Sequence, residues 1–335
     1  MDNLKENLSN NLSDNLIKKS NFVIIIPIMI ATFNFFLILY PTAMIEAGKE
    51  GLLMWFNQVL PTLLPFVVGA NLLASLGFIH FMGAIMAPVM APIFKVPGAG
   101  AFALLTGFTS GYPMGAKAVA HLRESNQITK SEAQRLIAFS NNAGPLFVIG
   151  FVGVGLFGSA RIGYLLLISH IAAALLVGLF VRFLSKERPN IGDAGIRAAF
   201  RKYHEFRKRH YRGFGSALGT SVSNAMESMV LIGGFIVVFC VLIKALEIVG
   251  FFNIEGAGFV AGLLEMANGA KMVASGGPPN AAAFAMAAAI ISFGGFSVHG
   301  QVAHFIRDTD IKFGPYLAAK AFQAFMAGVI SSILW

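Results

Sequence analysis

The sequence predicts an all-α polytopic membrane protein built on an inverted repeat, with two re-entrant hairpins and two broken transmembrane helices. Apolar residues occupy 56% of the 335 positions and charged residues only 12%, far from the composition of soluble proteins. Several stretches are long and apolar enough to cross a bilayer, which takes about 20 residues. A stretch that begins at Gly107 also aligns, without a gap and at a shift of 151 residues, with Gly258–Trp335.

The first 97 residues predict a polar segment followed by N-terminal transmembrane helices. Residues 1–21 carry leucines at a spacing of four, which places them on one face of a short interfacial helix. Within residues 22–97, the uncharged stretch up to Tyr40 predicts one span and residues 51–78 predict a second. The first span starts too late, and lacks an Ala-x-Ala-like site, to be a cleaved signal peptide.

The two copies of the repeat are expected to contain the same three parts in the same order. Each begins with a hairpin whose halves are too short to cross a bilayer singly, continues with an interrupted helix and ends with a long apolar span. In repeat 1, residues 98–184, these parts are 98–125, 131–157 and 161–184; in repeat 2, residues 258–335, the hairpin precedes 281–306 and 313–335. Residues 216–257 link the copies and contain a further span over 217–249.

Most of the positive charge lies in a basic loop, residues 185–215. Lys186–Arg212 holds nine Lys or Arg against three acidic residues, and such loops stay on the cytoplasmic side of a membrane. This placement accounts for much of the net charge of +9, so no nucleic-acid partner is predicted. A lipid headgroup contact or a regulatory role stays open for Tyr203, His204 and His210.

The position of the charges predicts that the two repeats are inverted. With Lys18-Lys19 and the basic loop both cytoplasmic, an even number of crossings separates them, so the first hairpin opens toward the cytoplasm. The span 217–249 then carries the chain outward, and the second hairpin opens on the outer side. Inverted repeats with broken helices form transport sites near the bilayer midplane.

The interruptions are expected to carry the chemistry. Thr129 starts a helix through a capping box with Glu132, and this helix reaches Asn141-Asn142-Ala143-Gly144-Pro145, where the proline frees backbone groups. Gly294-Gly295-Phe296-Ser297 is the matching break in repeat 2. Unpaired backbone groups are costly in lipid, so both breaks should face a polar cavity. Half-helices that begin at Pro145 and Ser297 would present N–H groups suited to an anion.

Polar residues at the hairpins and breaks are the candidate substrate-binding residues. They are Ser110, Tyr112, Lys117, Asn141, Asn142, Glu265, Asn268, Ser297, His299 and Gln301. Lys117 and Glu265 are charges inside membrane hairpins, which are expensive and usually paired or functional. Alternatives stay open: Lys117 reaching the interface or pairing with Glu265, the two asparagines capping helix ends, and His299 as a core histidine.

Enzymatic activity and a resident cofactor or metal are not expected. Gly153-Val154-Gly155-Leu156-Phe157-Gly158 matches a dinucleotide fingerprint, but no strand precedes it, and small-residue helix packing explains it better. No P-loop or GxSxG motif occurs in the sequence. His299 and His304 are five residues apart, off the spacing of two zinc ligands, and Cys240 is the single cysteine.

Three motifs resemble the sporulation integral membrane protein family called YlbJ or SpoVV, over a region from about Glu46 to Trp335. They are Gly111-Tyr112-Pro113-Met114-Gly115-Ala116-Lys117, Ser140-Asn141-Asn142-Ala143-Gly144-Pro145-Leu146-Phe147 and Ser292-Phe293-Gly294-Gly295-Phe296-Ser297-Val298-His299-Gly300-Gln301. The resemblance implies a nucleoside-recognition "gate" domain, also found in the FeoB iron transporter, and a fold related to concentrative nucleoside transporters. It further implies a link to the movement of dipicolinate, an aromatic dicarboxylate, toward the forespore.

These observations predict a secondary transporter of a small organic anion in the bacterial inner membrane or forespore membrane. Lys117 and the half-helix N-termini would meet carboxylates, Tyr112 would stack on a ring, the amides would hydrogen-bond, and Glu265 would couple transport to Na⁺ or H⁺. One alternative is a nucleoside or nucleobase carrier that uses Glu265 and Asn268 on ribose hydroxyls. Another is a non-transporting gate or scaffold subunit. A homo-oligomer remains open.

Overall fold

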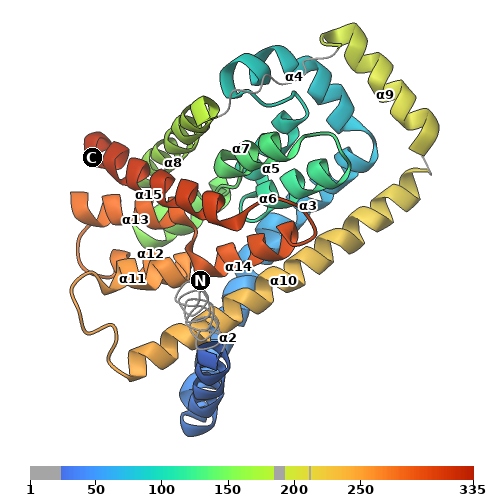
Figure 1. Cartoon of the computed structure of the whole chain (residues 1–335). Helices are drawn as coiled ribbons and strands as arrows, with labels where there is room; N and C mark the ends of the chain where they lie inside the picture. Colours follow the sequence, from blue (N-terminus) through green and yellow to red (C-terminus); the bar gives the residue numbers. More distant parts are fainter. Residues whose placement is uncertain (1–23, 185–192, 211–212) are drawn as a thin grey trace, which may run out of the picture.

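The protein is seen in a computed structural model that describes residues 24–184, 193–210 and 213–335. Every regular element in these ranges is a helix, and five helices are long and apolar enough to cross a membrane (Figure 1). They are Pro41–Ser75, Ala160–Leu184, Phe214–Ile248, Ala281–Ile306 and Phe313–Leu334. The predicted fold class, an all-α polytopic membrane protein, is confirmed. The predicted N-terminal interfacial helix lies outside the described residues.

The N-terminal region contains one long continuous helix and one that the sequence did not predict. After the apolar helix Ile24–Leu39, α2 (Pro41–Met54), η1 (Trp55–Val59) and α3 (Leu60–Ser75) follow each other without a gap. The unpredicted helix is α4 (Phe78–Phe94). Within the basic loop, α9 (Ile196–His210) lies against α4, with the Phe81 ring 5.3 Å from that of Phe200.

The two repeats contain equivalent helices. In repeat 1 these are α5 (Gly100–Ser110), α6 (Met114–Glu124), α7 (Lys130–Ser140), η2 (Leu146–Leu156) and α8 (Ala160–Val181, extended by η3, Arg182–Leu184). In repeat 2 they are α11 (Ala257–Leu264), α12 (Met266–Ala274), α13 (Ala281–Phe293), α14 (Gly295–Ile306) and α15 (Phe313–Leu334). In both, two short helices form a hairpin, a broken helix follows and a 22-residue helix comes last. The shift found in the sequence therefore relates whole structural elements.

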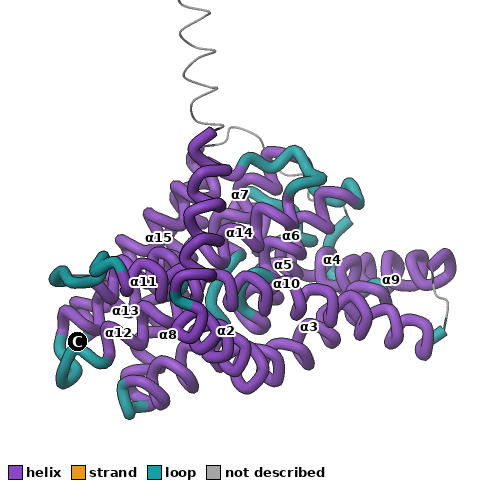
Figure 2. Tube along the Cα trace, turned by 90° about the horizontal axis from the view of Figure 1, so that it is seen from below, coloured by secondary structure: helices purple, strands orange, loops and turns teal. Residues whose placement is uncertain are grey.

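The repeats pack on each other reciprocally, as parts related by a pseudo-twofold axis do. Helix α15 packs on α7, and its counterpart α8 packs on α13. In the same way α6 of the first hairpin contacts α14, and α12 of the second contacts η2. The linking helix α10 (Phe214–Ile248) runs diagonally along one side and packs on α2 and α3 (Figures 1 and 2). Repeat inversion and hairpins that re-enter the bilayer stay predictions.

Both predicted breaks occur where the sequence placed them. Helix α7 ends at Ser140, residues 141–144 are not helical, and η2 starts at Leu146 after Pro145. In repeat 2, α13 ends at Phe293, and Gly294 and Gly295 have φ angles of 90° and 78°, a region that glycine adopts without strain. The predicted capping box at Thr129 is confirmed, because Thr129 accepts from the Glu132 N–H while Glu132 accepts from the Thr129 N–H.

Candidate functional site

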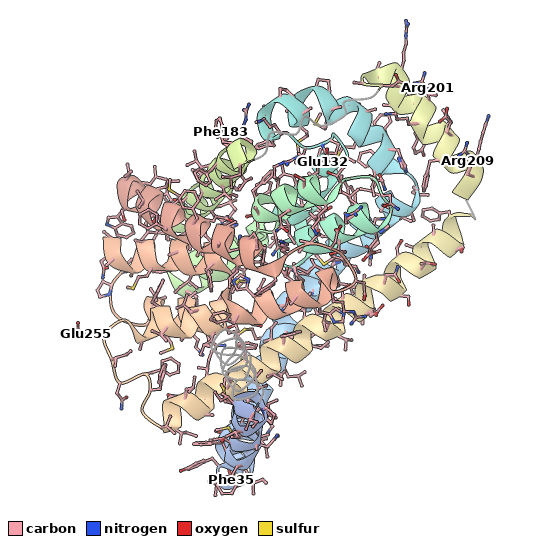
Figure 3. The ribbon with its side chains drawn as sticks, viewed as in Figure 1. Phe35, Glu132, Phe183, Arg201, Arg209 and Glu255 are labelled. Carbon is pink, nitrogen blue, oxygen red and sulfur yellow. The ribbon has the colours of Figure 1, made fainter. Side chains whose placement is uncertain are left out.

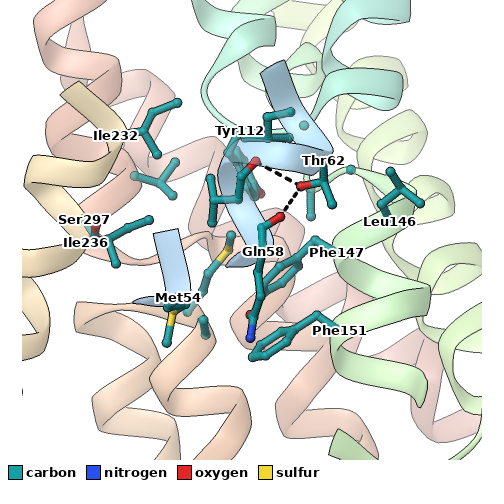
Figure 4. A pocket seen from close by; sticks show the side chains of 18 of the residues that line it. Met54, Gln58, Thr62, Tyr112, Leu146, Phe147, Phe151, Ile232, Ile236 and Ser297 are labelled. Atoms are coloured by element: carbon teal, nitrogen blue, oxygen red, sulfur yellow. Dashed lines mark hydrogen bonds between the residues drawn. The ribbon is translucent and has the colours of Figure 1, made fainter. Parts of the chain in front are cut away.

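A cavity of about 440 Å³ lies where both breaks and both hairpin tips meet (Figure 4). Hairpin 1 contributes Gly111 and Tyr112, hairpin 2 contributes Glu265, Met266 and Ala267, the first break contributes Ala143 and Gly144, the second contributes Ser297, and the helices that follow the breaks contribute Leu146, Phe147, Val298 and Gln301. The rest of the wall comes from the continuous helix between Met54 and Leu63, from Gly150, Phe151 and Gly155 of η2, and from Ile232 and Ile236 of α10. The volume falls in the range of small-molecule sites.

The cavity wall combines aromatic rings with a few polar groups. Phe147 and Phe151 lie on successive turns of η2, with ring centroids 5.3 Å apart, and both point into the cavity in Figure 4. Tyr112 lies across from them at the tip of hairpin 1. Its hydroxyl donates to the carbonyls of Ile291 and Ser292 at 3.2 and 3.1 Å, so hairpin 1 is tied to the end of α13. Such a wall suits a flat ring with polar substituents.

Two helix N-termini face this cavity. η2 begins beside Gly144 and Leu146, and α14 begins two residues before Ser297. Within the described parts of the chain, neither end is capped by a side chain. The first N–H groups of a helix carry partial positive charge. At η2, Pro145 has no N–H and the N–H groups of Phe147 and Val148 both donate to the Gly144 carbonyl, so at this end the helix dipole, rather than those N–H groups, favours an anion.

Glu265 is a buried carboxylate at the cavity wall, and it caps the N-terminus of α12. It accepts hydrogen bonds from the N–H groups of Ala267 at 3.1 Å and Asn268 at 2.8 Å, and from the Asn268 side-chain amide at 2.9 Å. Only 4% of the residue is exposed, and no Lys or Arg of the described ranges forms an ion pair with it. The helix end and the amide stabilise its charge. Glu265 and Asn268, both candidate binding residues, are thus in direct contact.

Asn141 and Asn142 lie behind the cavity wall and hold the first break together. The Asn141 side chain accepts from the Ala116 N–H at 3.3 Å and donates to the Tyr316 hydroxyl at 2.9 Å. The Asn142 side chain donates to the Phe139 carbonyl at 2.7 Å and accepts from Gln323 at 3.0 Å. Both asparagines are fully buried. Asn142 binds a carbonyl at the end of α7, which is the alternative role the sequence left open, whereas Asn141 joins the break to α6 and α15.

Lys320 was not predicted from the sequence as a site residue, and it is fully buried in the same network. Its Nζ donates to the Asn141 carbonyl at 2.8 Å and to Gln323 Oε1 at 2.5 Å, and it lies 5.0 Å from the centre of the Tyr112 ring. Lys320 is the lone charged residue of Phe313–Trp335, a signal that could have singled it out. Gln323 and His170 were also missed.

His170 of α8 and Ser292 of α13 are in contact beside the second break. His170 Nε2 accepts the Ala143 N–H at 3.0 Å, so the ring proton is on Nδ1, which lies 2.7 Å from Ser292 Oγ. A side chain of α8 therefore reaches both breaks. His299, by contrast, packs edge-on against Phe293, with its Nδ1 3.2 Å from the Tyr316 hydroxyl.

The remaining candidate residues are divided between the cavity and its surroundings. Ser297 and Gln301 line the cavity, whereas Ser110 is buried in hairpin 1 beside it. Lys117 lies outside the cavity lining: its Nζ donates to Ser228 Oγ at 2.7 Å and to the Asn224 carbonyl at 3.4 Å, both on α10. The structure thus separates Lys117 from Glu265. It also leaves Ser110 Oγ and Ser297 Oγ without a hydrogen-bond partner among the described residues.

Comparison with known proteins decides the family. The sporulation integral membrane protein YlbJ of Bacillus subtilis (strain 168) is 35% identical over 336 aligned residues, which cover 92% of this chain and 82% of that protein. This chain belongs to the YlbJ family. The family model described as Gate, nucleoside recognition, matches residues 56–185, which contain all of repeat 1 and the part of the cavity wall between Asn57 and Gly155. No solved structure matches the chain.

Proposed function

We propose that this YlbJ-family membrane protein is a permease for a small organic anion, with an aromatic dicarboxylate such as dipicolinate as the first substrate to test. The observation that carries the proposal is that one cavity touches both helix breaks and both hairpin tips. A site at the contact of two repeats can be opened to either side when the repeats rock against each other. Three aromatic rings and two uncapped helix N-termini suit a ring that bears carboxylates.

A nucleoside or nucleobase carrier is the second candidate. The matching family model is described as nucleoside recognition, and the cavity also presents amide and carboxylate groups that can bind hydroxyls. We further propose that the chain acts in a forespore membrane, since its relative is named a sporulation protein. In this proposal the chain needs no cofactor, and Glu265 couples transport to Na⁺ or H⁺.

The test is uptake into proteoliposomes that contain the purified full chain. Labelled dipicolinate and a labelled nucleoside are offered separately, each under a Na⁺ gradient, a pH gradient or neither. A substitution that fills the cavity separates transport through it from leakage. Gly150 lines the cavity and has open space where a Cβ would stand, so Gly150→Trp should block uptake without disturbing packing. Gly234→Trp is the matched control, because Gly234 also has open space but lies outside the cavity lining, on α10.

The expected result is uptake of the dicarboxylate by wild type and Gly234→Trp, and at least a tenfold loss in Gly150→Trp. Lys117→Met tests the prediction that Lys117 meets a substrate carboxylate; its contacts with α10 suggest that uptake survives. Uptake of the nucleoside alone would favour the second candidate. If wild type carries neither compound under any gradient, the chain acts as a gate or scaffold and the transport proposal fails.

A further inference from the structure

Lys320 places a buried amino group where no carboxylate lies beside it. Its side chain is fully buried, and the ion pairs among the described residues all lie elsewhere, on exposed or half-exposed side chains such as Arg201 (Figure 3). A buried charge is costly, so the surroundings must stabilise an ammonium at this place in another way. They do so with two neutral oxygens, the Asn141 carbonyl and Gln323 Oε1, and with the face of the Tyr112 ring.

These groups are the ligands that a free monovalent cation would use. Carbonyl oxygens of an unwound segment and the C-terminal end of a half-helix bind coupling cations in transporters with broken helices. The Asn141 carbonyl lies one residue after the end of α7, where the helix dipole is negative. An aromatic face adds attraction for a cation.

The other ionisable groups that face Lys320 are two tyrosines and two histidines. Tyr112 belongs to hairpin 1, Tyr316 to α15 itself, His170 to α8 and His299 to α14. His170 Nε2 accepts a backbone N–H and so carries no proton, while the Tyr316 hydroxyl accepts from the Asn141 amide and lies 3.2 Å from His299 Nδ1. Among the described residues, no carboxylate is therefore in contact with the Lys320 amino group.

We propose that Lys320 is a built-in cation, whose ammonium group occupies a monovalent-cation site at the first break and holds the end of α7 against α15. A tethered cation is always present, so this position needs no free Na⁺. The consequence for transport rests on the proposed function: uptake should not require Na⁺ at this break. The cation site itself does not depend on any substrate.

The decisive variant is Lys320→Ala in the full chain, which removes the ammonium and leaves space beside the same oxygens. Thermal unfolding in detergent is measured in chloride salts of equal ionic strength: sodium, potassium, ammonium, ethylammonium and the bulky N-methyl-D-glucamine. We expect the Tm of Lys320→Ala to rise by roughly 3 °C or more in one of the small cations relative to N-methyl-D-glucamine, since a ligand of the folded state stabilises it. Ethylammonium fits best, because it restores both the charge and part of the missing chain.

Two other variants make the result specific. Lys117→Ala removes a half-buried lysine that also donates to uncharged oxygens, and its Tm should not depend on the cation. Lys320→Met fills the space but gives Asn141 and Gln323 no donor, so it should unfold several degrees below wild type in every salt. Equal cation responses of Lys320→Ala and Lys117→Ala would overturn the proposal. A Tm of Lys320→Met equal to or above that of wild type would also overturn the proposal. This second comparison still tests the proposal if Lys320→Ala does not fold.

Uptake assays then separate this inference from the proposed function. Any Na⁺ dependence of wild type should come from Glu265 and should be lost in Glu265→Gln, and ethylammonium should restore part of the uptake lost in Lys320→Ala. A Na⁺ requirement that Glu265→Gln leaves unchanged would count against a built-in cation at this break. If no substrate is carried at all, the proposed function fails, but the unfolding series still decides whether Lys320 occupies a cation site.

Discussion

The two helix breaks occupy equivalent places in the two repeats, yet they are stabilised in different ways. The first break takes four residues and is held by side chains: Asn142 and Lys320 bind carbonyls that it releases, and Gln323 in turn donates to the Asn142 side chain. The second break consists of a turn at Gly294 and Gly295, both with positive φ, and its neighbouring carbonyls accept from Tyr112. The first break thus depends on hydrogen bonds from side chains. The second break depends on the positive φ angles that its two glycines can adopt.

This difference shows how a duplicated scaffold becomes asymmetric. Symmetry supplies the position of the breaks and the cavity between them, because the same elements pack reciprocally. The residues that fill the equivalent places have diverged, so a cationic side chain is buried at one break and not at the other. Substitutions at the two breaks should therefore differ in their effects on stability.

The largest effect is expected where hairpin 1 packs on the first break. A Cβ at Gly115 would lie 2.0 Å from the Ser140 carbonyl oxygen and 2.9 Å from the Asn141 Cα. Neither backbone atom can move without displacing α7, so Gly115→Ala should prevent recovery of folded protein in detergent. Gly234→Ala, on an open face of helix α10, should fold normally and gain about 0.5–1 kcal/mol from helix propensity. Size-exclusion profiles of the two variants make the comparison.

The next largest effect is expected at Asn142. Asn142→Ala leaves the Phe139 carbonyl without its donor and removes the acceptor of Gln323, and each unsatisfied buried group costs about 1–3 kcal/mol. Ser292→Ala at the second break removes one contact, the acceptor of His170 Nδ1, and should cost about half as much. Denaturation of both variants would check the order. A greater loss in Ser292→Ala would contradict the view that the first break depends more on side chains.

A smaller effect is expected from the backbone of the second break. Gly295 has a φ of 78°, and an alanine there costs about 1–2 kcal/mol from conformation alone. Its Cβ would lie 3.0 Å from the Gly262 carbonyl, close enough that hairpin 2 must shift slightly. Gly295→Ala should therefore fold with a Tm a few degrees lower. An unchanged Tm would mean that the second break has no need of glycine.

The sequence predicted the breaks because their causes are local. Pro145 lacks an N–H, Gly294-Gly295 permits positive φ, and the Thr129–Glu132 capping box defines where α7 begins. The sequence could not predict which face of each hairpin helix points toward the cavity. Lys117 stands beside a glycine-rich tip and was expected at the site, but α6 directs it to α10. The sequence also could not predict that residues between Met54 and Leu63 form part of the cavity wall, because these residues meet the repeats only through tertiary packing.

The sequence contains a signal that could have identified Lys320 as a site residue. A lone charge in the middle of an otherwise uncharged span is a stronger signal than one beside a loop, because lipid offers it no alternative partner. The sequence did not show which of the two breaks the Lys320 side chain would contact. That contact depends on α15 packing against α7 of the other repeat.

The smallest effect is expected at the surface, where the repeats are joined by an ion pair. Arg123 at the end of α6 donates to Asp310, which follows α14, at 2.9 and 3.0 Å. Hydrogen bonds from Arg123 hold the pKa of Asp310 below its usual value. The lowered pKa means that the pair stabilises the fold above the unfolded carboxyl's pKa of about 4, and that this contribution is lost as the pH falls through the lower folded value.

Asp310→Asn should accordingly lower the Tm only slightly at pH 7, and less in high salt, because exposed pairs contribute little and are screened. The difference from wild type should shrink as the pH falls from about 4 through the lower folded pKa of Asp310, since the wild-type carboxyl then loses its charge as well. Asp308→Asn is the matched control, because its partner Arg307 is the next residue on the same loop and joins no other element. A difference that persists at pH 3, or that matches the control, would show that this contact does not help to join hairpin 1 to repeat 2.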